Sequence, residues 1–242
     1  MENQINHPIS VSPAVVKRLP RYYRYLRELI TQGRMRISSG ELSSLMNVTA
    51  SQIRQDLNCF GGFGQQGYGY NVNYLFAKIS EILGVGAGFH AVIIGAGDLG
   101  RGLVHQSMFE KRGVDILAMF DTGEGIVGQN VAGIEVLALD KLEEFCATHQ
   151  VDIAVLTCPK ELVRPISDRL VTCKVKGLWN YMGVELGYTP QEIVVENVHL
   201  GDSLMILNYK IASRFENRTD EERAELVSSE DSISDLSDNP NE

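Results

Sequence analysis

The stretch from His90 to Asp121, HAVIIGAGDLGRGLVHQSMFEKRGVDILAMFD, decides the fold of this chain. An apolar run enters the sequence GAGDLG, an amphipathic segment follows, and a second apolar run ends on Asp121. This order predicts a strand, a tight glycine turn, a helix and a second strand. Strands and helices continue to alternate up to residue 200, which predicts a Rossmann-like, doubly wound parallel sheet with helices on both faces over residues 85–200.

The glycine turn predicts a dinucleotide site. Its first glycine permits the turn, its second lets the backbone approach a pyrophosphate, and its third lets the helix pack on the strand. Asp121 lies about 20 residues further on, where a carboxylate bonds the ribose hydroxyls and repels a 2′-phosphate, so NAD(H) is favoured over NADP(H). The expected contacts are this turn, this acid and the ends of two later strands: Gly95, Ala96, Gly97, Asp98, Leu99, Gly100, Asp121, Thr157, Cys158, Pro159 and Asn180.

The net charge of −9 is distributed unevenly over the 242 residues. Residues 1–84 carry 9 Lys and Arg against 5 Asp and Glu, residues 85–214 carry 11 against 16, and residues 215–242 carry 2 against 10. A basic front and an acidic tail indicate different partners along one chain. Neither a long apolar run nor an export signal is present, which favours a cytoplasmic protein without a membrane span, and the four scattered cysteines predict no metal site.

The basic front predicts a winged helix-turn-helix domain over residues 12–84. Ser12 and Pro13 start a helix that Pro20 should kink or split, and two capped helices follow, the second from Thr49 to Leu57. Residues 58–70, NCFGGFGQQGYGY, then indicate a small hairpin, or wing. With Thr49–Leu57 as the recognition helix, the candidate DNA contacts are Lys17, Arg18, Arg21, Thr49, Ser51, Gln52, Arg54, Gln55, Gln66 and Tyr68.

Both ends of the chain differ from its middle in composition. Residues 201–215 form a last helix with apolar residues at helical spacing, which must pack on its own domain or on a partner subunit. Residues 1–11 and the acidic residues 216–242 contain too few apolar side chains to fold and are expected to be disordered.

Several motifs in this order resemble the Rex family of redox-sensing transcriptional repressors, over roughly residues 10–215. They are VVKRLPRYYRYLRELITQG from Val15, TASQIRQDL from Thr49, GQQGYGYNV from Gly64, IGAGDLG from Ile94, FD from Phe120, LTCP from Leu156 and KGLWNY from Lys176. The resemblance implies a homodimer that exchanges its C-terminal helices and binds palindromic operator DNA when NADH is scarce. NADH would rotate the subunits and release the DNA. Leu200 stands where some members set an aromatic ring against the nicotinamide.

The chain departs from the family pattern at positions that touch both activities. Gln55 stands where the family commonly carries a basic residue in the recognition helix, and Gln65 and Gln66 stand where its wing often carries one, so DNA binding should be weaker or less salt-dependent. In the family an arginine matching Arg24 is linked to an aspartate and a tyrosine, whose positions here hold His199 and Gln106. One hypothesis is therefore a Rex-like protein in which the coupling of DNA affinity to NADH is altered or lost.

Three other hypotheses come from the residues. An NAD-dependent dehydrogenase would need a proton donor beside the nicotinamide, and only His199 lies near a suitable strand end, which disfavours an enzyme. A thiol switch could use Cys59, beside the wing, or Cys158. A winged-helix protein could also hold NAD(H) structurally without responding to it.

Overall fold

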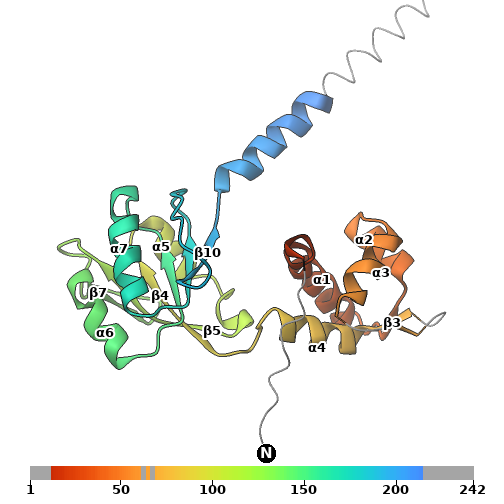
Figure 1. Cartoon of the computed structure of the whole chain (residues 1–242), viewed down its shortest axis with the longest axis horizontal. Helices are drawn as coiled ribbons and strands as arrows, with labels where there is room; N and C mark the ends of the chain where they lie inside the picture. Colours follow the sequence, from red (N-terminus) through yellow and green to blue (C-terminus); the bar gives the residue numbers. More distant parts are fainter. Residues whose placement is uncertain (1–11, 61–63, 66–68, 215–242) are drawn as a thin grey trace, which may run out of the picture. The chain divides into compact units, whose positions relative to one another are not determined.

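The computed structural model describes residues 12–60, 64–65 and 69–214 (Figure 1). The chain divides into two compact units, the first made of residues 1–89 with 106–115 and the second of residues 90–105 with 116–242. This division falls near the boundary expected at residue 84. The expected disorder of residues 1–11 and 216–242 concerns segments outside the described residues.

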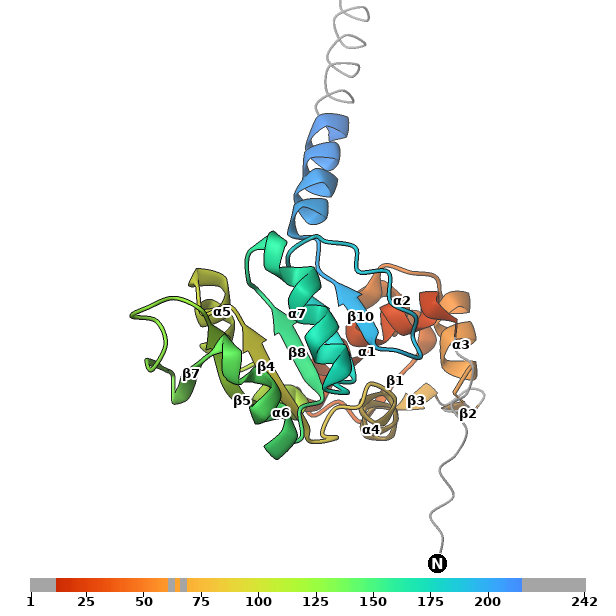
Figure 2. The same ribbon diagram turned by 60° about the vertical axis from the view of Figure 1, so that its left-hand side comes forward.

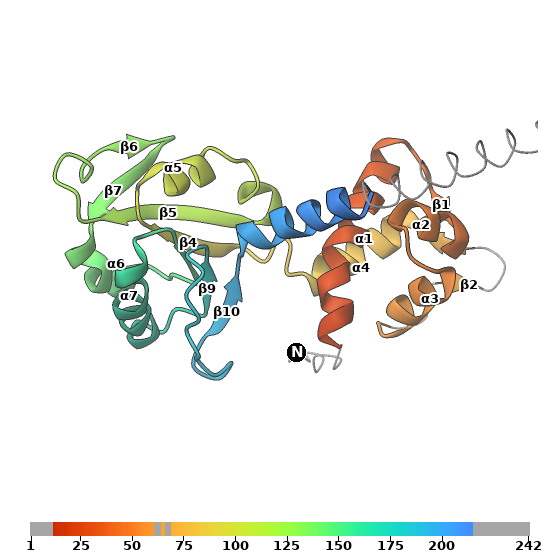
Figure 3. The same ribbon diagram turned by 90° about the horizontal axis from the view of Figure 1, so that it is seen from above.

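The first unit contains four helices and a small sheet among its described residues. The helices are α1 (Pro13–Thr31), α2 (Ser39–Met46), α3 (Ala50–Asn58) and α4 (Val72–Ile82). Strands β1 (Arg36–Ile37), β3 (Gly69–Asn71) and β2 (Gly64–Gln65) pair antiparallel in that order, and Figure 3 shows them beside α2 and α3. Two short helices followed by a hairpin form a winged helix-turn-helix.

The helices of this unit begin where their capping residues predict. The Ser12 and Thr49 side chains accept hydrogen bonds from backbone N–H groups in the first turns of α1 and α3, and Ser38 with Glu41 forms a complete capping box at α2. Of the kink or split expected at Pro20, the split is wrong, because α1 continues to Thr31. Proline removes one backbone hydrogen bond, and the buried apolar residues on both sides of it offset that loss. These core residues of α1 are Val15, Leu19, Tyr22, Tyr23, Leu26 and Leu29.

The second unit is built on a seven-stranded sheet with the order β10-β9-β8-β4-β5-β7-β6 (Figure 2). Its strands are β4 (Phe89–Ile94), β5 (Val114–Asp121), β6 (Asn130–Val131), β7 (Ile134–Ala138), β8 (Ile153–Leu156), β9 (Gly177–Asn180) and β10 (Val194–Asn197). The pairs of β4 with β8, β8 with β9, β9 with β10 and β5 with β7 are parallel, and only the short β6 pairs antiparallel. Ligands bind such sheets where the strand order reverses, which here is between β4 and β8.

Three helices cover this sheet: α5 (Asp98–Val104), α6 (Leu142–Thr148) and α7 (Lys160–Thr172). Buried residues of the strands and of α7 form one apolar core, which includes Val92, Phe120, Leu156 and Ile166. The Rossmann-like sheet and the N-terminal winged helix predicted from the sequence are both present.

A helix over residues 200–214 leaves the sheet after β10 and extends away from it (Figure 1). Its apolar side chains are exposed in the single chain: Leu200, Leu204, Met205, Ile206, Leu207, Tyr209 and Ile211. Of the two outcomes expected for this helix, packing on its own domain does not occur along the described residues. Among those residues no helix is both long and apolar enough to cross a membrane.

Candidate functional site: a nucleotide pocket and a recognition helix

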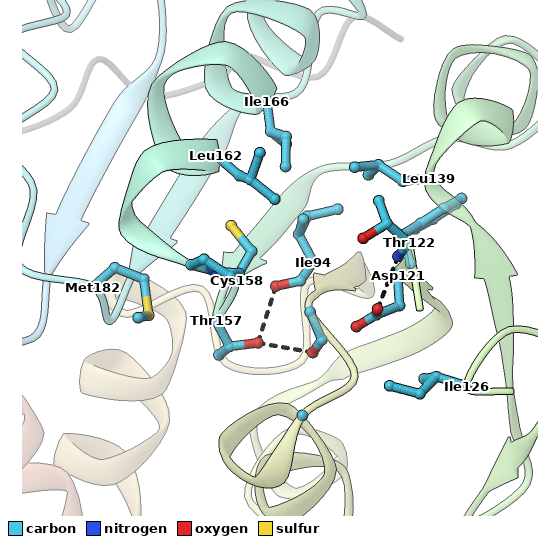
Figure 4. Close-up of a pocket in the computed structure, with 14 residues that line it drawn as sticks. Ile94, Asp121, Thr122, Ile126, Leu139, Thr157, Cys158, Leu162, Ile166 and Met182 are labelled. Atoms are coloured by element: carbon cyan, nitrogen blue, oxygen red, sulfur yellow. Dashed lines mark hydrogen bonds between the residues drawn. The ribbon is translucent and has the colours of Figure 1, made fainter. Parts of the chain in front are cut away.

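A pocket of about 430 Å³ opens at the carboxyl ends of β4, β5 and β8 (Figure 4). This is the position that the strand order marks for a ligand. Its lining is Ile94, Gly95, Gly97, Phe120, Asp121, Thr122, Ile126, Leu139, Thr157, Cys158, Pro159, Leu162, Ile166 and Met182. The structure therefore brings together six of the predicted cofactor residues, drawn from three strand ends: Gly95, Gly97, Asp121, Thr157, Cys158 and Pro159.

The glycine turn is packed tightly against the end of β8. Gly95 has a φ of +103°, and a Cβ there would lie 2.7 Å from backbone atoms of Thr157. The Thr157 hydroxyl donates to the carbonyl oxygens of Ile94 and Gly95 at 3.0 and 2.9 Å, which joins the two strand ends. A Cβ on Gly100 would lie 2.0 Å from the Gly95 carbonyl oxygen. Glycine is required at both positions for the turn to form.

Gly97 differs from these two glycines because a Cβ there would meet no described heavy atom within 4 Å. It is exposed, lines the pocket and precedes the first residue of α5 without a side-chain cap. A missing side chain at this point leaves open space through which a pyrophosphate could approach the backbone. The turn therefore fits the phosphates of a dinucleotide.

Asp121 is held at the mouth of the pocket by the backbone around it (Figure 4). One carboxylate oxygen accepts a hydrogen bond from the N–H of Ala96 at 2.6 Å. The other accepts from the N–H groups of Thr122 and Gly123, both at 2.8 Å. A carboxylate has about four acceptor positions, so the ion retains capacity for a ribose hydroxyl.

One wall of the pocket is apolar, and sequence reasoning missed it. Leu139 precedes α6, Leu162 and Ile166 project from α7, and Ile126 lies on the loop after β5 (Figure 4). Leu162 and Ile166 are spaced by four residues, so their pattern was visible, but that pattern usually marks only a core-facing helix side. Aliphatic side chains such as Leu162 and Ile166 suit contact with the face of an adenine ring.

Cys158 is a buried thiol in this pocket, with 3 % of its surface exposed. Burial raises its pKa to about 11, and the nearby Asp121 carboxylate also raises it. Because the thiolate is the reactive form, a neutral thiol here disfavours the hypothesis of a thiol switch at Cys158. Within the described part of the chain, no group of three or more His, Cys, Asp or Glu side chains could hold a metal ion.

Asn180 lies behind the pocket rather than in its lining. Its buried amide donates to the Val184 carbonyl oxygen at 2.7 Å and to Asn197 Oδ1 at 2.8 Å, and its oxygen accepts from the N–H of Met182 at 3.0 Å. These bonds hold the loop that carries Met182 into the pocket. Direct contact of a cofactor with Asn180 stays a prediction, as it does for the other predicted residues outside the lining: Ala96, Asp98, Leu99, Gly100 and Leu200.

The three predicted switch residues are all exposed. His199 lies directly before the helix over residues 200–214, and its Nε2 atom is 3.7 Å from a carboxylate oxygen of Glu185. Arg24 and Gln106 belong to the first unit. A role of Arg24, Gln106 and His199 in a switch stays a prediction.

The recognition helix α3 is attached to α1 through a buried carboxylate. Asp56 is completely buried and accepts two hydrogen bonds of 2.7 Å from the Arg18 guanidinium. It also accepts from the Tyr22 hydroxyl at 2.9 Å and from the Gln52 amide at 2.7 Å. Burial raises the pKa of Asp56, but these hydrogen bonds outweigh it and hold the pKa below its usual value. Arg18 and Gln52, predicted to contact DNA, are thus engaged within the domain.

The remaining predicted DNA contacts fall into three groups, and Thr49 belongs to the first of them, because its hydroxyl caps α3 by accepting from the N–H of Gln52 at 3.1 Å. Arg21 donates to the Met46 carbonyl oxygen at 2.5 Å, and Arg54 donates to the Ser39 hydroxyl at 3.1 Å, so both also join helices of the domain. Three exposed side chains have no hydrogen bond or ion pair with another described residue: Lys17, Ser51 and Gln55. Gln66 and Tyr68 lie outside the described residues.

A winged helix-turn-helix and a Rossmann-like sheet with a dinucleotide-sized pocket define a class: DNA-binding proteins that carry a nucleotide-binding domain. Two family models match the chain accordingly. The model described as "Putative DNA-binding protein N-terminus" matches residues 10–58, and the model described as "CoA binding domain" matches residues 89–183.

The chain belongs to the Rex family of redox-sensing transcriptional repressors. The redox-sensing transcriptional repressor Rex of Caldanaerobacter subterraneus subsp. tengcongensis is 47% identical over 201 residues, which cover 83% of this chain and 89% of the relative. Rex of Clostridium botulinum strain Alaska E43 is 46% identical over 202 residues, covering 84% of this chain and 96% of the relative.

Solved structures of RSP, a Rex-family repressor, are similar to most of this chain, and one of them covers 84% of it. RSP in complex with NAD⁺ and operator DNA has a TM-score of 0.79 and 44% identity, covering 86% of this chain and 96% of RSP. RSP in complex with NADH has a TM-score of 0.79 and 41% identity, covering 87% and 98%. The family resemblance read from the sequence is therefore confirmed.

Proposed function

We propose that this chain is a homodimeric transcriptional repressor that binds palindromic operator DNA and releases it when NADH binds. The observation that carries this proposal is the pairing, in one polypeptide, of a capped recognition helix with a pocket built from the glycine turn and Asp121. The relative RSP binds operator DNA together with NAD⁺ and also binds NADH, so both ligands occur within the family.

The pocket would hold the dinucleotide through contacts to each of its parts. The backbone at Gly97 would face the pyrophosphate, Asp121 would bond the adenosine ribose, and the adenine would lie against Leu162 and Ile166. A carboxylate beside the ribose repels a 2′-phosphate, so NAD(H) should bind in preference to NADP(H).

In this proposal the dinucleotide is a regulatory ligand and not a reactant. Its nicotinamide carries hydride in enzymes, but that chemistry needs a proton donor or acceptor beside the substrate. Among the residues that line the pocket, only Asp121 and Cys158 can ionise. Asp121 is engaged by three backbone N–H groups, and burial keeps the Cys158 thiol neutral. This supports a sensor and not a dehydrogenase.

The exposed apolar face of the helix over residues 200–214 supports the homodimer. Seven large apolar side chains in one helix need cover from another surface, and a second copy of the chain is the commonest source of such cover. Exchange of these helices between the two subunits would bury both faces at once.

A second candidate is a Rex-like repressor whose response to NADH is altered. The contact of His199 with Glu185 favours it. The family usually carries an aspartate at the position of His199, and here the histidine is oriented towards an acid of its own unit. This candidate and the sensor differ only in how DNA affinity depends on the dinucleotide.

Fluorescence anisotropy of a labelled duplex with the RSP operator sequence tests the proposal. At fixed total dinucleotide, DNA should dissociate as the NADH to NAD⁺ ratio rises, whereas NADPH and coenzyme A should leave the complex intact. A constant affinity at all ratios would identify the altered repressor. Failure to bind either the duplex or any dinucleotide would refute the proposal.

A further inference from the structure

Two cysteines that are 27 positions apart in the sequence lie on neighbouring helices of the second unit (Figure 3). Cys146 lies in α6 and Cys173 caps the end of α7, and each thiol affects the pKa of the other. Both are partly exposed, and both pack against the core of the second unit. Neither lines the nucleotide pocket, so this pair has no part in the function proposed above.

The two helices that carry the thiols are held at a fixed separation. Arg169 of α7 donates to both carboxylate oxygens of Glu143 in α6, at 2.5 and 2.6 Å, and to the Leu139 carbonyl oxygen at 2.8 Å. Figures 1 and 3 show α6 and α7 side by side. Cys146 follows Glu143 by three positions and Cys173 follows Arg169 by four, so this ion pair places the two cysteines at the same level on the facing sides of α6 and α7.

The surroundings of the pair indicate which sulfur reacts first. Burial, and to a smaller extent the nearby Cys173 and Glu143 side chains, raise the pKa of Cys146 to about 12. Burial and Glu143 also raise the pKa of Cys173, but the interaction with Cys146 and the nearby Arg169 guanidinium lower it. Cys173 is thus the thiol that ionises more readily and the better nucleophile at neutral pH. Since thiolate remains scarce, the reaction is slow compared with that of a low-pKa redox sensor.

We propose that Cys146 and Cys173 form an oxidation site, where a peroxide converts the two thiols into a reversible disulfide between α6 and α7. The Cys173 thiolate attacks one peroxide oxygen, the O–O bond breaks, and the released hydroxide takes a proton to become water. The Cys146 sulfur then attacks the resulting sulfenic acid and displaces a second water. Two thiols and one hydrogen peroxide give one disulfide and two waters.

The disulfide acts mainly on stability. It closes a loop of about 27 residues, which restricts the unfolded chain and should raise the melting temperature of the second unit by several degrees. The pocket residues Leu139, Leu162 and Ile166 lie towards the opposite ends of these two helices. We therefore expect the dissociation constant for NADH to change by less than about threefold.

Peptide mapping and thermal denaturation of the full reduced chain test this site. After treatment with hydrogen peroxide or diamide and alkylation, mass spectrometry should find a cross-linked peptide that joins residues 146 and 173. The melting temperature should rise, and dithiothreitol should reverse both changes. The variants Cys146→Ser and Cys173→Ser should lose the cross-link and the shift, whereas Cys59→Ser, a matched change in the other unit, should keep both.

Two results would overturn the inference. One is the absence of the cross-link under conditions that oxidise Cys59. The other is a cross-linked wild-type chain whose melting temperature equals that of the reduced chain. Circular dichroism of each reduced variant confirms that it is folded before oxidation, and Cys173→Ala replaces the serine variant if that variant is not.

Discussion

Arg18 holds the recognition helix in place through Asp56, and we expect replacement of Arg18 by methionine to loosen α3. Methionine keeps much of the aliphatic volume but removes both hydrogen bonds to the carboxylate. Asp56 then remains buried as an anion with only Tyr22 and Gln52 as donors. The same substitution also tests whether Arg18 is a DNA contact, as its position in a basic helix predicts.

The expected loss follows from the burial of the two partners. Breaking a buried ion pair costs about 3–5 kcal/mol because an uncompensated charge stays in the interior. The Asp56 side chain is 0% exposed but that of Arg18 is 26% exposed, so the lower limit of about 3 kcal/mol applies. Each 1.4 kcal/mol is a factor of ten, so the amides of α3 should lose roughly 100-fold in protection against hydrogen exchange.

Hydrogen exchange of the full chain, followed by mass spectrometry, measures this loss in peptides that cover α3. The single tryptophan, Trp179, lies in β9, so its fluorescence reports separately on the second unit and should not change. The double variant Arg18→Met/Asp56→Asn is the matched control. Its asparagine leaves no buried charge, and it can accept a hydrogen bond from Gln52 through its oxygen and donate one to the Tyr22 hydroxyl through its NH2 group, so most of the protection should return.

DNA binding of the same variants separates the two roles of Arg18. If Arg18 only positions α3, the double variant should regain both operator affinity and the salt dependence of the wild type. If Arg18 contacts a phosphate, the double variant should remain weak, and the slope of log K against log salt should fall by about one. Unchanged exchange protection in Arg18→Met would refute the positioning role outright.

Three further predictions concern the pocket, the capping box and the C-terminal helix. Gly95→Ala should disrupt the turn and abolish dinucleotide binding, whereas Gly97→Ala should keep the fold and lower affinity at least tenfold; calorimetry with NADH and circular dichroism distinguish them. The pKa of Glu41 is lowered to about 2, so the ionised carboxylate stabilises α2 above about pH 4.5 and this stabilisation is lost as the pH falls towards 2. Hydrogen exchange of the α2 amides should show this pH dependence in the wild type, and Glu41→Gln should abolish it. Leu207→Asp should shift sedimentation to a monomer, and Asn208→Asp on the same helix should not.

The sequence was sufficient for features in which neighbouring residues determine the structure. The turn at Gly95 could be predicted because glycines close together in the sequence leave no side chain where the turn has no room for one. Helices α2 and α3 begin at residues whose side chains cap the first turn of the same helix. The sheet follows from the alternation of such local units. Pro20 was misjudged because local reasoning counts the lost hydrogen bond but not the core contacts on either side.

Features that join distant residues could not be predicted. Arg18 and Asp56 are 38 positions apart, and a basic residue on a helix gives no sign of whether it faces DNA or a buried acid. The amide of Asn180 is committed to Val184 and Asn197, a bonding pattern that depends on how a loop returns to the sheet. The proximity of Cys146 and Cys173 likewise arises only when α6 packs beside α7.

The exposed apolar helix over residues 200–214 would make repression depend on the concentration of the protein in the cell. If dimerisation is what buries its apolar side chains, dilution favours monomers. A monomer cannot bind both halves of a palindromic operator, and its exposed apolar side chains favour nonspecific association with other surfaces. Repression would then fall more steeply than the number of molecules, because each functional unit requires two of them. Dosage, as well as redox state, would set the output.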